Sequence, residues 1–146
     1  MCFKISWLLI TCLWCFSAVC VAQPNRQDSI ASIVEVMAAH NVYESSYTIG
    51  YTGAYSSQYQ LYVKLVQVAT AADLTHLILQ HKNAVVRLYA YQALKTKTAE
   101  MPKEVIFVMA RDKNKLITLN GCIAQDRSVD SIFNMSIFNL LNMGSR

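Results

Sequence analysis

The sequence predicts an all-α fold, a short α-solenoid of about two helix pairs with flanking capping helices and a tyrosine-rich loop. Three observations predict it. Apolar residues recur at spacings of three and four, helix-capping residues precede those segments, and the chain resembles itself at one fixed interval. The 146 residues are 54% hydrophobic, which suits one domain over residues 23–146 with an ample core.

The N-terminus has the layout of a secretory signal peptide. Lys4 gives a basic start, residues 5–19 are apolar and uncharged, and Cys20-Val21-Ala22 supplies small residues for a signal peptidase. We therefore expect a signal peptide over residues 1–22, cleavage after Ala22, and export to a periplasm or out of the cell. The alternatives are an uncleaved anchor helix, for which the apolar run is short, and a lipid anchor on Cys20, for which Val19 fits poorly.

Helix-start signals occur in succession along the rest of the chain. Thr70 and Asp73 have the spacing of a capping box, and Asn83 is a good N-cap for the segment after it. The predicted helices run from Asp28 or Ser29 to about 40, from 57 to about 68, from about 71 through 80, from 84 to about 95, from 102 to about 110, and onward from Ser128.

An internal repeat decides the structure of the one ambiguous segment. Residues 72–93 match residues 103–124, with apolar positions coinciding and the turn Lys82-Asn83 meeting Lys113-Asn114. Taken alone, residues 115–125 favour a strand, because Ile, Thr and Cys are middling helix formers and Gly weakens a helix. We give the repeat more weight and predict a helix there. The two repeats then cover about 70–96 and 102–125.

The first repeat carries the pattern N-x-V-V-R-x-x-A-x-x-A-L from Asn83 to Leu94. The pattern resembles the second helix of a HEAT-like repeat, of the kind found in small exported bacterial proteins described mostly by that domain alone. Ala84 stands where that family often has proline. The resemblance implies a ladder between neighbouring repeats, in which Arg87 bridges to Asp112 or to nearby turn carbonyls. The alternative is that Arg87 points into solvent and contributes little.

Two groups of residues form the candidate interaction surface. Tyrosines recur at every fourth position from Tyr43 to Tyr59, but Gly50 and Gly53 make a helix unfavourable there. We expect a loop whose tyrosines pack over the helices, with a recognition surface as the alternative. The residues assigned to the candidate surface are Tyr47, Tyr51, Tyr55, Lys82, Lys113 and Lys115.

The basic excess between Lys82 and Lys115 has two interpretations. Eight lysines and arginines face only three acidic residues in this stretch, within a chain of formal net charge +4. A solvated surface is the favoured interpretation, and attraction to nucleic acid or anionic lipid is the alternative. Export argues against nucleic acid as a partner. A membrane contact is expected only through an uncleaved signal segment.

The sequence carries no recognisable catalytic, cofactor or metal motif. Cys122 is the one cysteine left after signal removal, and we expect a buried inert thiol, with pairing to another chain as the alternative. The favoured function is a non-catalytic scaffold or protein-interaction module that contacts a protein or an envelope component. One alternative is a small envelope enzyme or metal binder using His76, His81 and Cys122, and another is a purely structural envelope protein.

Overall fold

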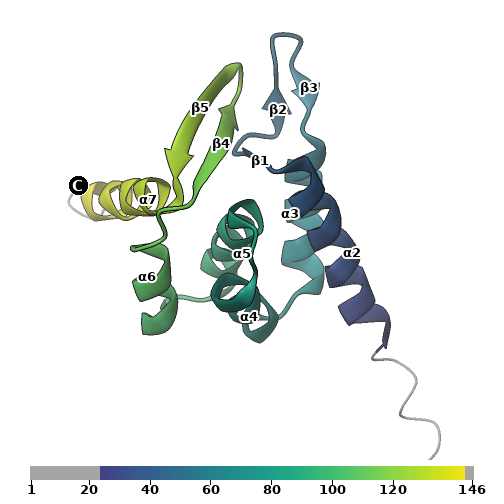
Figure 1. Ribbon diagram of the computed structural model, residues 1–146, viewed down its shortest axis with the longest axis vertical. Helices are drawn as coiled ribbons and strands as arrows, with labels where there is room; N and C mark the ends of the chain where they lie inside the picture. Colours follow the sequence, from purple (N-terminus) through teal and green to yellow (C-terminus); the bar gives the residue numbers. More distant parts are fainter. Residues whose placement is uncertain (1–23, 144–146) are drawn as a thin grey trace, which may run out of the picture.

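The computed structural model describes residues 24–143 and shows a mixed α/β fold, so the predicted all-α solenoid is wrong (Figure 1). Within these residues the helices are α2 (Pro24–His40), α3 (Ser57–Val68), α4 (Ala71–Gln80), α5 (Ala84–Lys97), α6 (Lys103–Met109) and α7 (Val129–Met143). The strands are β1 (Val42–Glu44), β2 (Thr48–Ile49), β3 (Ala54–Tyr55), β4 (Lys115–Asn120) and β5 (Ile123–Ser128). The predicted signal peptide, residues 1–22, and its predicted cleavage site lie outside the described residues.

Side-chain caps begin three of the predicted helices. Asp73 N donates to Thr70 Oγ1 at 3.2 Å and Thr70 N donates to Asp73 Oδ2 at 2.8 Å, which is the reciprocal capping box of α4. Asn83 Oδ1 accepts from the second and third backbone N–H groups of α5 at 2.8 and 3.1 Å. Helix α3 is capped by Ser56, whose Oγ accepts from Tyr59 N at 2.8 Å.

Residues 115–125, predicted as a helix, belong to the β-hairpin β4–β5. The strands pair antiparallel from Lys115↔Ser128 to Asn120↔Ile123, which leaves Gly121 and Cys122 as a two-residue loop. Gly121 has φ +56°, a backbone conformation that residues other than glycine rarely adopt. Glycine is preferred at the first position of such two-residue loops. The local strand preference of this segment therefore prevails over the register of the sequence repeat.

The two turns that the sequence repeat aligns share one local hydrogen bond, and the elements after them differ. His81 Nδ1 accepts from Asn83 N at 3.1 Å, and Asp112 Oδ1 accepts from Asn114 N at 3.0 Å, so the turns share the same local hydrogen bond. The two asparagines then differ. Asn83 Oδ1 caps α5, whereas Asn114 Nδ2 donates back to Asp112 Oδ1 at 2.6 Å and a strand comes next.

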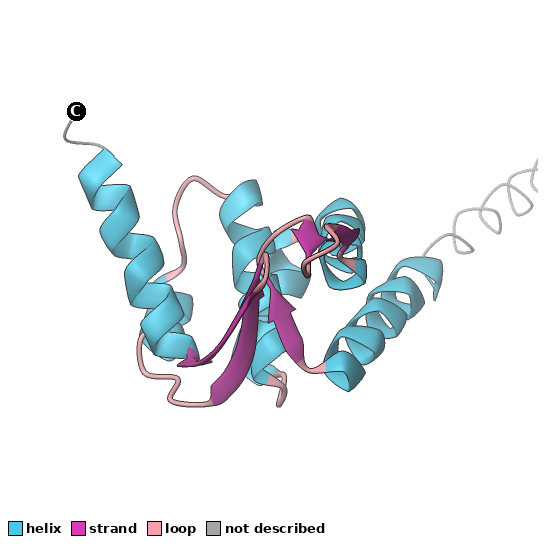
Figure 2. Ribbon diagram, turned by 90° about the horizontal axis from the view of Figure 1, so that it is seen from above, coloured by secondary structure: helices cyan, strands magenta, loops and turns pink. Residues whose placement is uncertain are grey.

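The strands form two small sheets beside the helices. β1 pairs parallel with β4, which gives a sheet of order β1-β4-β5, and β2 pairs with β3 as a separate hairpin. Helices α2 and α7 lie on opposite sides of the strands, and α5 lies between α3 and α6 (Figures 1 and 2). No helix among residues 24–143 combines the length and apolarity needed to cross a bilayer.

Helix α5 is the centre of the core. Residues 85–91 are all buried, and because successive residues point about 100° apart, this run buries the helix on every side. The helix contacts α2, α3, α4, β1 and β4. Arg87 is the one charged residue of this buried run, and it is only 8% exposed.

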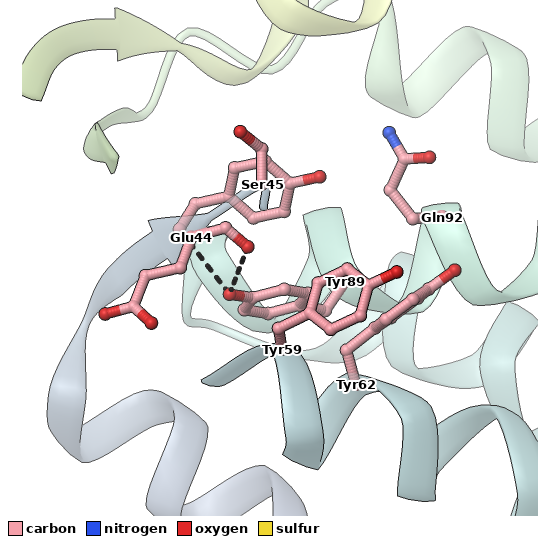
Figure 3. Close-up of a pocket in the computed structure, with 7 residues that line it drawn as sticks. Glu44, Ser45, Tyr59, Tyr62, Tyr89 and Gln92 are labelled. Atoms are coloured by element: carbon pink, nitrogen blue, oxygen red, sulfur yellow. Dashed lines mark hydrogen bonds between the residues drawn. The ribbon is translucent and has the colours of Figure 1, made fainter. Parts of the chain in front are cut away.

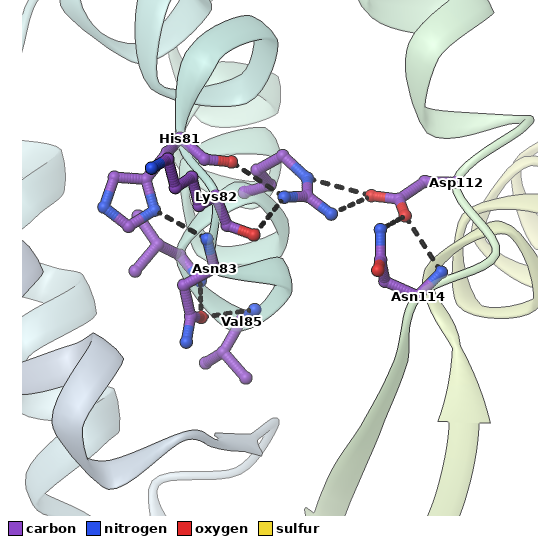
Figure 4. Close-up of polar contacts among 8 residues, drawn as sticks. His81, Lys82, Asn83, Val85, Asp112 and Asn114 are labelled. Atoms are coloured by element: carbon purple, nitrogen blue, oxygen red, sulfur yellow. Dashed lines mark hydrogen bonds and ion pairs between the residues drawn. The ribbon is translucent and has the colours of Figure 1, made fainter.

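The Arg87 side chain bonds two turns. Figure 4 shows both turns, with His81 and Lys82 in one and Asp112 in the other. Its Nε and Nη2 donate to Asp112 Oδ2 at 2.9 and 2.5 Å, and its Nη1 donates to the carbonyls of His81 and Lys82 at 2.7 and 2.8 Å. Asp112 O in turn accepts from Asp130 N at 3.0 Å, at the start of α7. Arg87 thus joins the α4–α5 turn to the segment that leads into β4. The same segment is hydrogen-bonded to the start of α7.

Replacing Gly121 by alanine distinguishes the hairpin from the predicted helix, because the two structures predict opposite changes in the free energy of unfolding. A Cβ added at Gly121 meets no atom within 4 Å, so the cost comes from the positive φ alone. We expect Gly121→Ala to lower the free energy of unfolding by about 1–2 kcal/mol in urea denaturation. A helix would instead gain about 1 kcal/mol from this change, so a gain in stability would contradict the hairpin.

A double-mutant cycle measures the coupling between Arg87 and Asp112. Arg87→Ala or Asp112→Ala leaves a buried charge without its partner, and each should cost about 3–5 kcal/mol of stability. The double variant should lose clearly less than the sum of the two. The pair Lys113–Asp130, in which the lysine side chain is 80% exposed, is the control and should couple more weakly. Additive losses at Arg87 and Asp112 would remove the pairing.

Candidate functional site

Six tyrosine rings form a continuous path from the surface to the core. Neighbouring ring centroids lie 4.8–6.0 Å apart, within the range of favourable aromatic pairs. The path runs in the order Tyr55, Tyr47, Tyr59, Tyr62, Tyr89 and Tyr43.

Four separate elements contribute to this tyrosine path. Tyr55 belongs to β3 and Tyr47 precedes β2, and Ser56 N donates to Tyr47 O at 2.9 Å to close that hairpin. Tyr59 and Tyr62, three residues apart, lie on one face of α3. Tyr89 comes from α5 and Tyr43 from β1. The four-residue spacing in the sequence therefore arises from a strand, a hairpin and a helix, and not from one helical stripe.

The tyrosines of the β2–β3 hairpin are exposed. Tyr51 is 100% exposed, Tyr55 67% and Tyr47 52%, whereas Tyr89 and Tyr43 at the inner end of the path are buried. The expected packing of the loop over the core therefore applies to the inner tyrosines only. We call Tyr47, Tyr51 and Tyr55 the tyrosine hairpin.

A cavity of about 200 Å³ lies beside the inner part of the tyrosine path, between α3, α5 and β1 (Figure 3). Its lining consists almost entirely of neutral groups that can donate or accept hydrogen bonds. The lining residues are Tyr43, Glu44, Ser45, Tyr59, Tyr62, Tyr89 and Gln92.

Three tyrosine hydroxyls and one amide face each other across this cavity. Burial raises the pKa of Tyr43, the Tyr62 and Tyr59 hydroxyls raise it further, and a hydrogen bond with Gln92 opposes the rise. Burial and the Tyr59 hydroxyl likewise raise the pKa of Tyr62. These hydroxyls are therefore protonated at neutral pH, and the cavity presents uncharged hydrogen-bonding groups.

The Tyr89 hydroxyl closes the free edge of β1. It accepts from Glu44 N at 2.9 Å and donates to Glu44 O at 3.2 Å, so both backbone groups of Glu44 are satisfied. Burial is the main cause of the raised pKa of Tyr89. The Glu44 carboxylate points away from the cavity, where it accepts from Ser56 Oγ and lies 3.0 Å from His40 Nε2 (Figure 3).

A second cavity of about 330 Å³ lies between the strands β4 and β5 and the helix α7. It adjoins the first cavity, because Tyr43 and Ser45 line both. The register places its strand residues on one face of the sheet, because residues paired in adjacent strands point the same way. Two residues of α7 cover the far side. The further lining residues are Thr118, Asn120, Ile123, Gln125, Arg127, Ile132 and Met135.

The predicted interaction surface does not form one patch. Lys82 lies at the α4–α5 turn, and Lys113 and Lys115 lie at the start of β4. The tyrosine hairpin instead contacts the opposite end of β4, where Gly50 N donates to Gly121 O at 3.0 Å. The six residues of β4, roughly 16 Å of extended chain, separate the two groups.

The histidines and cysteine of the enzymatic alternative are also apart. His76 and His81 line different cavities, one beside α6 and one beside α2. Cys122 is exposed at the β4–β5 loop, where its thiol donates to Gly50 O at 3.2 Å, so the expected burial of this thiol is wrong. Across the described part of the chain, no three metal-binding side chains come together.

The cavity residues Ser45, Tyr62, Tyr89 and Gln92 were not among the predicted site residues. The i, i+3 spacing of Tyr59 and Tyr62 in a predicted helix was the one sequence signal for them. Tyr89 resembles a core residue in an apolar helix, and Ser45 and Gln92 come to the same cavity through the long-range packing of β1 against α5.

Comparisons with protein-family models, with curated proteins and with solved structures found no match for this chain. The resemblance to HEAT-like repeats therefore stays a prediction. It now concerns the pair α4 and α5 alone, since residues 115–125 form strands.

Removing the Tyr89 hydroxyl tests whether it closes the edge of β1. In Tyr89→Phe the backbone N–H and C=O of Glu44 lose their partner while the ring packing stays. We expect a loss of about 1–3 kcal/mol in the free energy of unfolding. Tyr51→Phe removes a hydroxyl from a fully exposed ring and should change stability by less than about 0.5 kcal/mol. Equal effects of the two variants would contradict this role.

Proposed function

We propose that the protein is an exported, non-catalytic interaction module whose recognition surface is the tyrosine hairpin with the adjoining cavity. The observation that carries the proposal is the full exposure of Tyr51, together with the exposed Tyr47 and Tyr55, on a hairpin that is hydrogen-bonded to the main sheet. Exposed aromatic residues clustered on one element are typical of binding surfaces.

The hairpin is held in place before any partner binds. Gly50 N donates to Gly121 O at 3.0 Å, and Gly121 N donates to Ser46 Oγ at 3.1 Å. The Ser46 hydroxyl also donates to Thr48 O at 2.8 Å. A tyrosine has few rotatable bonds, and a prearranged hairpin loses little further conformational entropy on binding. Both properties favour recognition.

The alternatives have less support. An enzyme or metal binder would need His76, His81 and Cys122 close together, and they lie in three places. A purely structural protein has no use for the fully exposed ring of Tyr51. The proposed partner is a protein or a cell-envelope component. Nucleic acid is not proposed, because export would separate the protein from it and the lysines lie away from the tyrosines.

Recovery of partners from the native envelope tests the proposal. The bait variant Tyr51→Ala/Tyr55→Ala should recover its partner in at least about tenfold lower yield than the wild type, because exposed tyrosines are frequent binding hot spots. The control Ile106→Ala/Phe107→Ala removes exposed apolar side chains from α6 and should recover the partner as the wild type does. Equal recovery of every partner by all three baits would leave the tyrosine hairpin without this role.

A further inference from the structure

We propose that the cavity binds one pyranose ring of a neutral oligosaccharide, and that neighbouring sugar rings of the ligand lie along Tyr47 and Tyr55. The inference deepens the proposed function and rests on it, since it names the class of envelope component. Three features support it, namely the lining of the cavity, the closed edge of β1 and the tyrosine path.

The lining groups match the hydrogen-bonding chemistry of a sugar. The hydroxyls of Tyr43, Tyr59 and Tyr62 and the amide of Gln92 each both donate and accept, as sugar hydroxyls do. In the described part of the chain, no side chain or backbone group hydrogen-bonds the hydroxyl of Tyr59 or Tyr62, so both remain available to a ligand. A cavity of about 200 Å³ is below the usual size for drug-like ligands and suits a single ring.

The electrostatics favour an uncharged ligand. Glu44 is the one ionisable carboxyl or basic group among the seven lining residues, and its carboxylate is occupied by Ser56 and His40 outside the cavity. Burial raises the pKa values of Tyr43 and Tyr62, so these two hydroxyls are uncharged at neutral pH. An anionic or cationic ligand would therefore lose its hydration without gaining an opposite charge.

The backbone disfavours an extended peptide as the occupant. A peptide strand would need free N–H and C=O groups on the edge of β1 that faces the cavity. Tyr89 Oη already bonds both of these groups of Glu44, at 2.9 and 3.2 Å. A peptide would have to displace this buried hydroxyl, whereas a sugar can use the side chains as they are.

The tyrosine path provides room for more than one sugar ring. Tyr59 lines the cavity and its ring centroid lies 5.8 Å from that of Tyr47, which lies 5.0 Å from that of Tyr55. The ring face of a tyrosine carries partial negative charge and attracts the polarised C–H groups on one face of a pyranose. Tyr47 and Tyr55 are half exposed or more, so a ligand chain can reach them from the cavity.

Calorimetric titration of the full chain with chitohexaose, cellohexaose and maltohexaose tests the inference. We expect at least one hexasaccharide to bind, and Tyr59→Phe/Tyr62→Phe to weaken it about tenfold or more, since two hydrogen bonds are lost while both rings stay. Phe107→Ala removes an exposed ring from α6, which lines neither the cavity nor the tyrosine hairpin, and should leave the affinity within about twofold. Thermal melting of each variant checks that the fold is retained.

Three outcomes would overturn the inference. The first is that no hexasaccharide binds at a concentration of about 10 mM, near the weak limit of specific binding. The second is equal binding by the wild type and the Tyr59→Phe/Tyr62→Phe variant. The third is that an equimolar mixture of random hexapeptides binds instead and is weakened by that variant. If the tyrosine hairpin retains a protein partner in the recovery experiment while sugars fail, the proposed function stands and this inference falls.

Discussion

The buried ion pair between Arg87 and Asp112 holds the α4–α5 turn to the segment before β4, and the rest of the structure depends on this contact. A charge this buried is unfavourable unless it is fully paired, and Arg87 meets this demand with the carboxylate on one side and two turn carbonyls on the other. The pair therefore fixes the segment leading into β4 against the first turn of the central helix α5. Because the carbonyls of Asp112 and Asn114 also accept from the first N–H groups of α7, the last helix is positioned by the same turn.

The tyrosine surface lies at the far end of the strand that this ion pair positions. β4 begins at Lys115, just after the turn that holds Asp112, and ends at Asn120, just before the loop residue Gly121. Gly121 O accepts a hydrogen bond from Gly50 N in the tyrosine hairpin. Tyr43 and Glu44 of β1 line the cavity together with Tyr89 and Gln92 of α5, and β1 pairs parallel with β4. The Arg87–Asp112 pair, the sheet and the proposed recognition surface are thus connected through β4.

Local chemistry predicted more of this protein than its internal repeat did. The caps at Thr70 and Asn83 are short-range features that a sequence shows directly, and the helices they begin are where they were expected. The repeat matched two turns whose hydrogen bonds are alike, but a helix follows one turn and a strand follows the other, in line with the strand preference of residues 115–125. Asn83 caps a helix, and Asn114 folds back on Asp112. The exposed tyrosines could be selected from the sequence, whereas the cavity required the long-range packing of β1 against α3 and α5, which no local pattern contains.

Hydrogen exchange at the Gly50 amide, followed by NMR, tests most directly whether the recognition surface is held by the sheet. We expect protection of this amide comparable to that of the β4–β5 ladder, because its N–H donates to Gly121 O at 3.0 Å. Exchange of Gly50 at the rate of an unstructured peptide, while the amides of β4 remain protected, would contradict this expectation, since the tyrosine hairpin would then move independently of the fold.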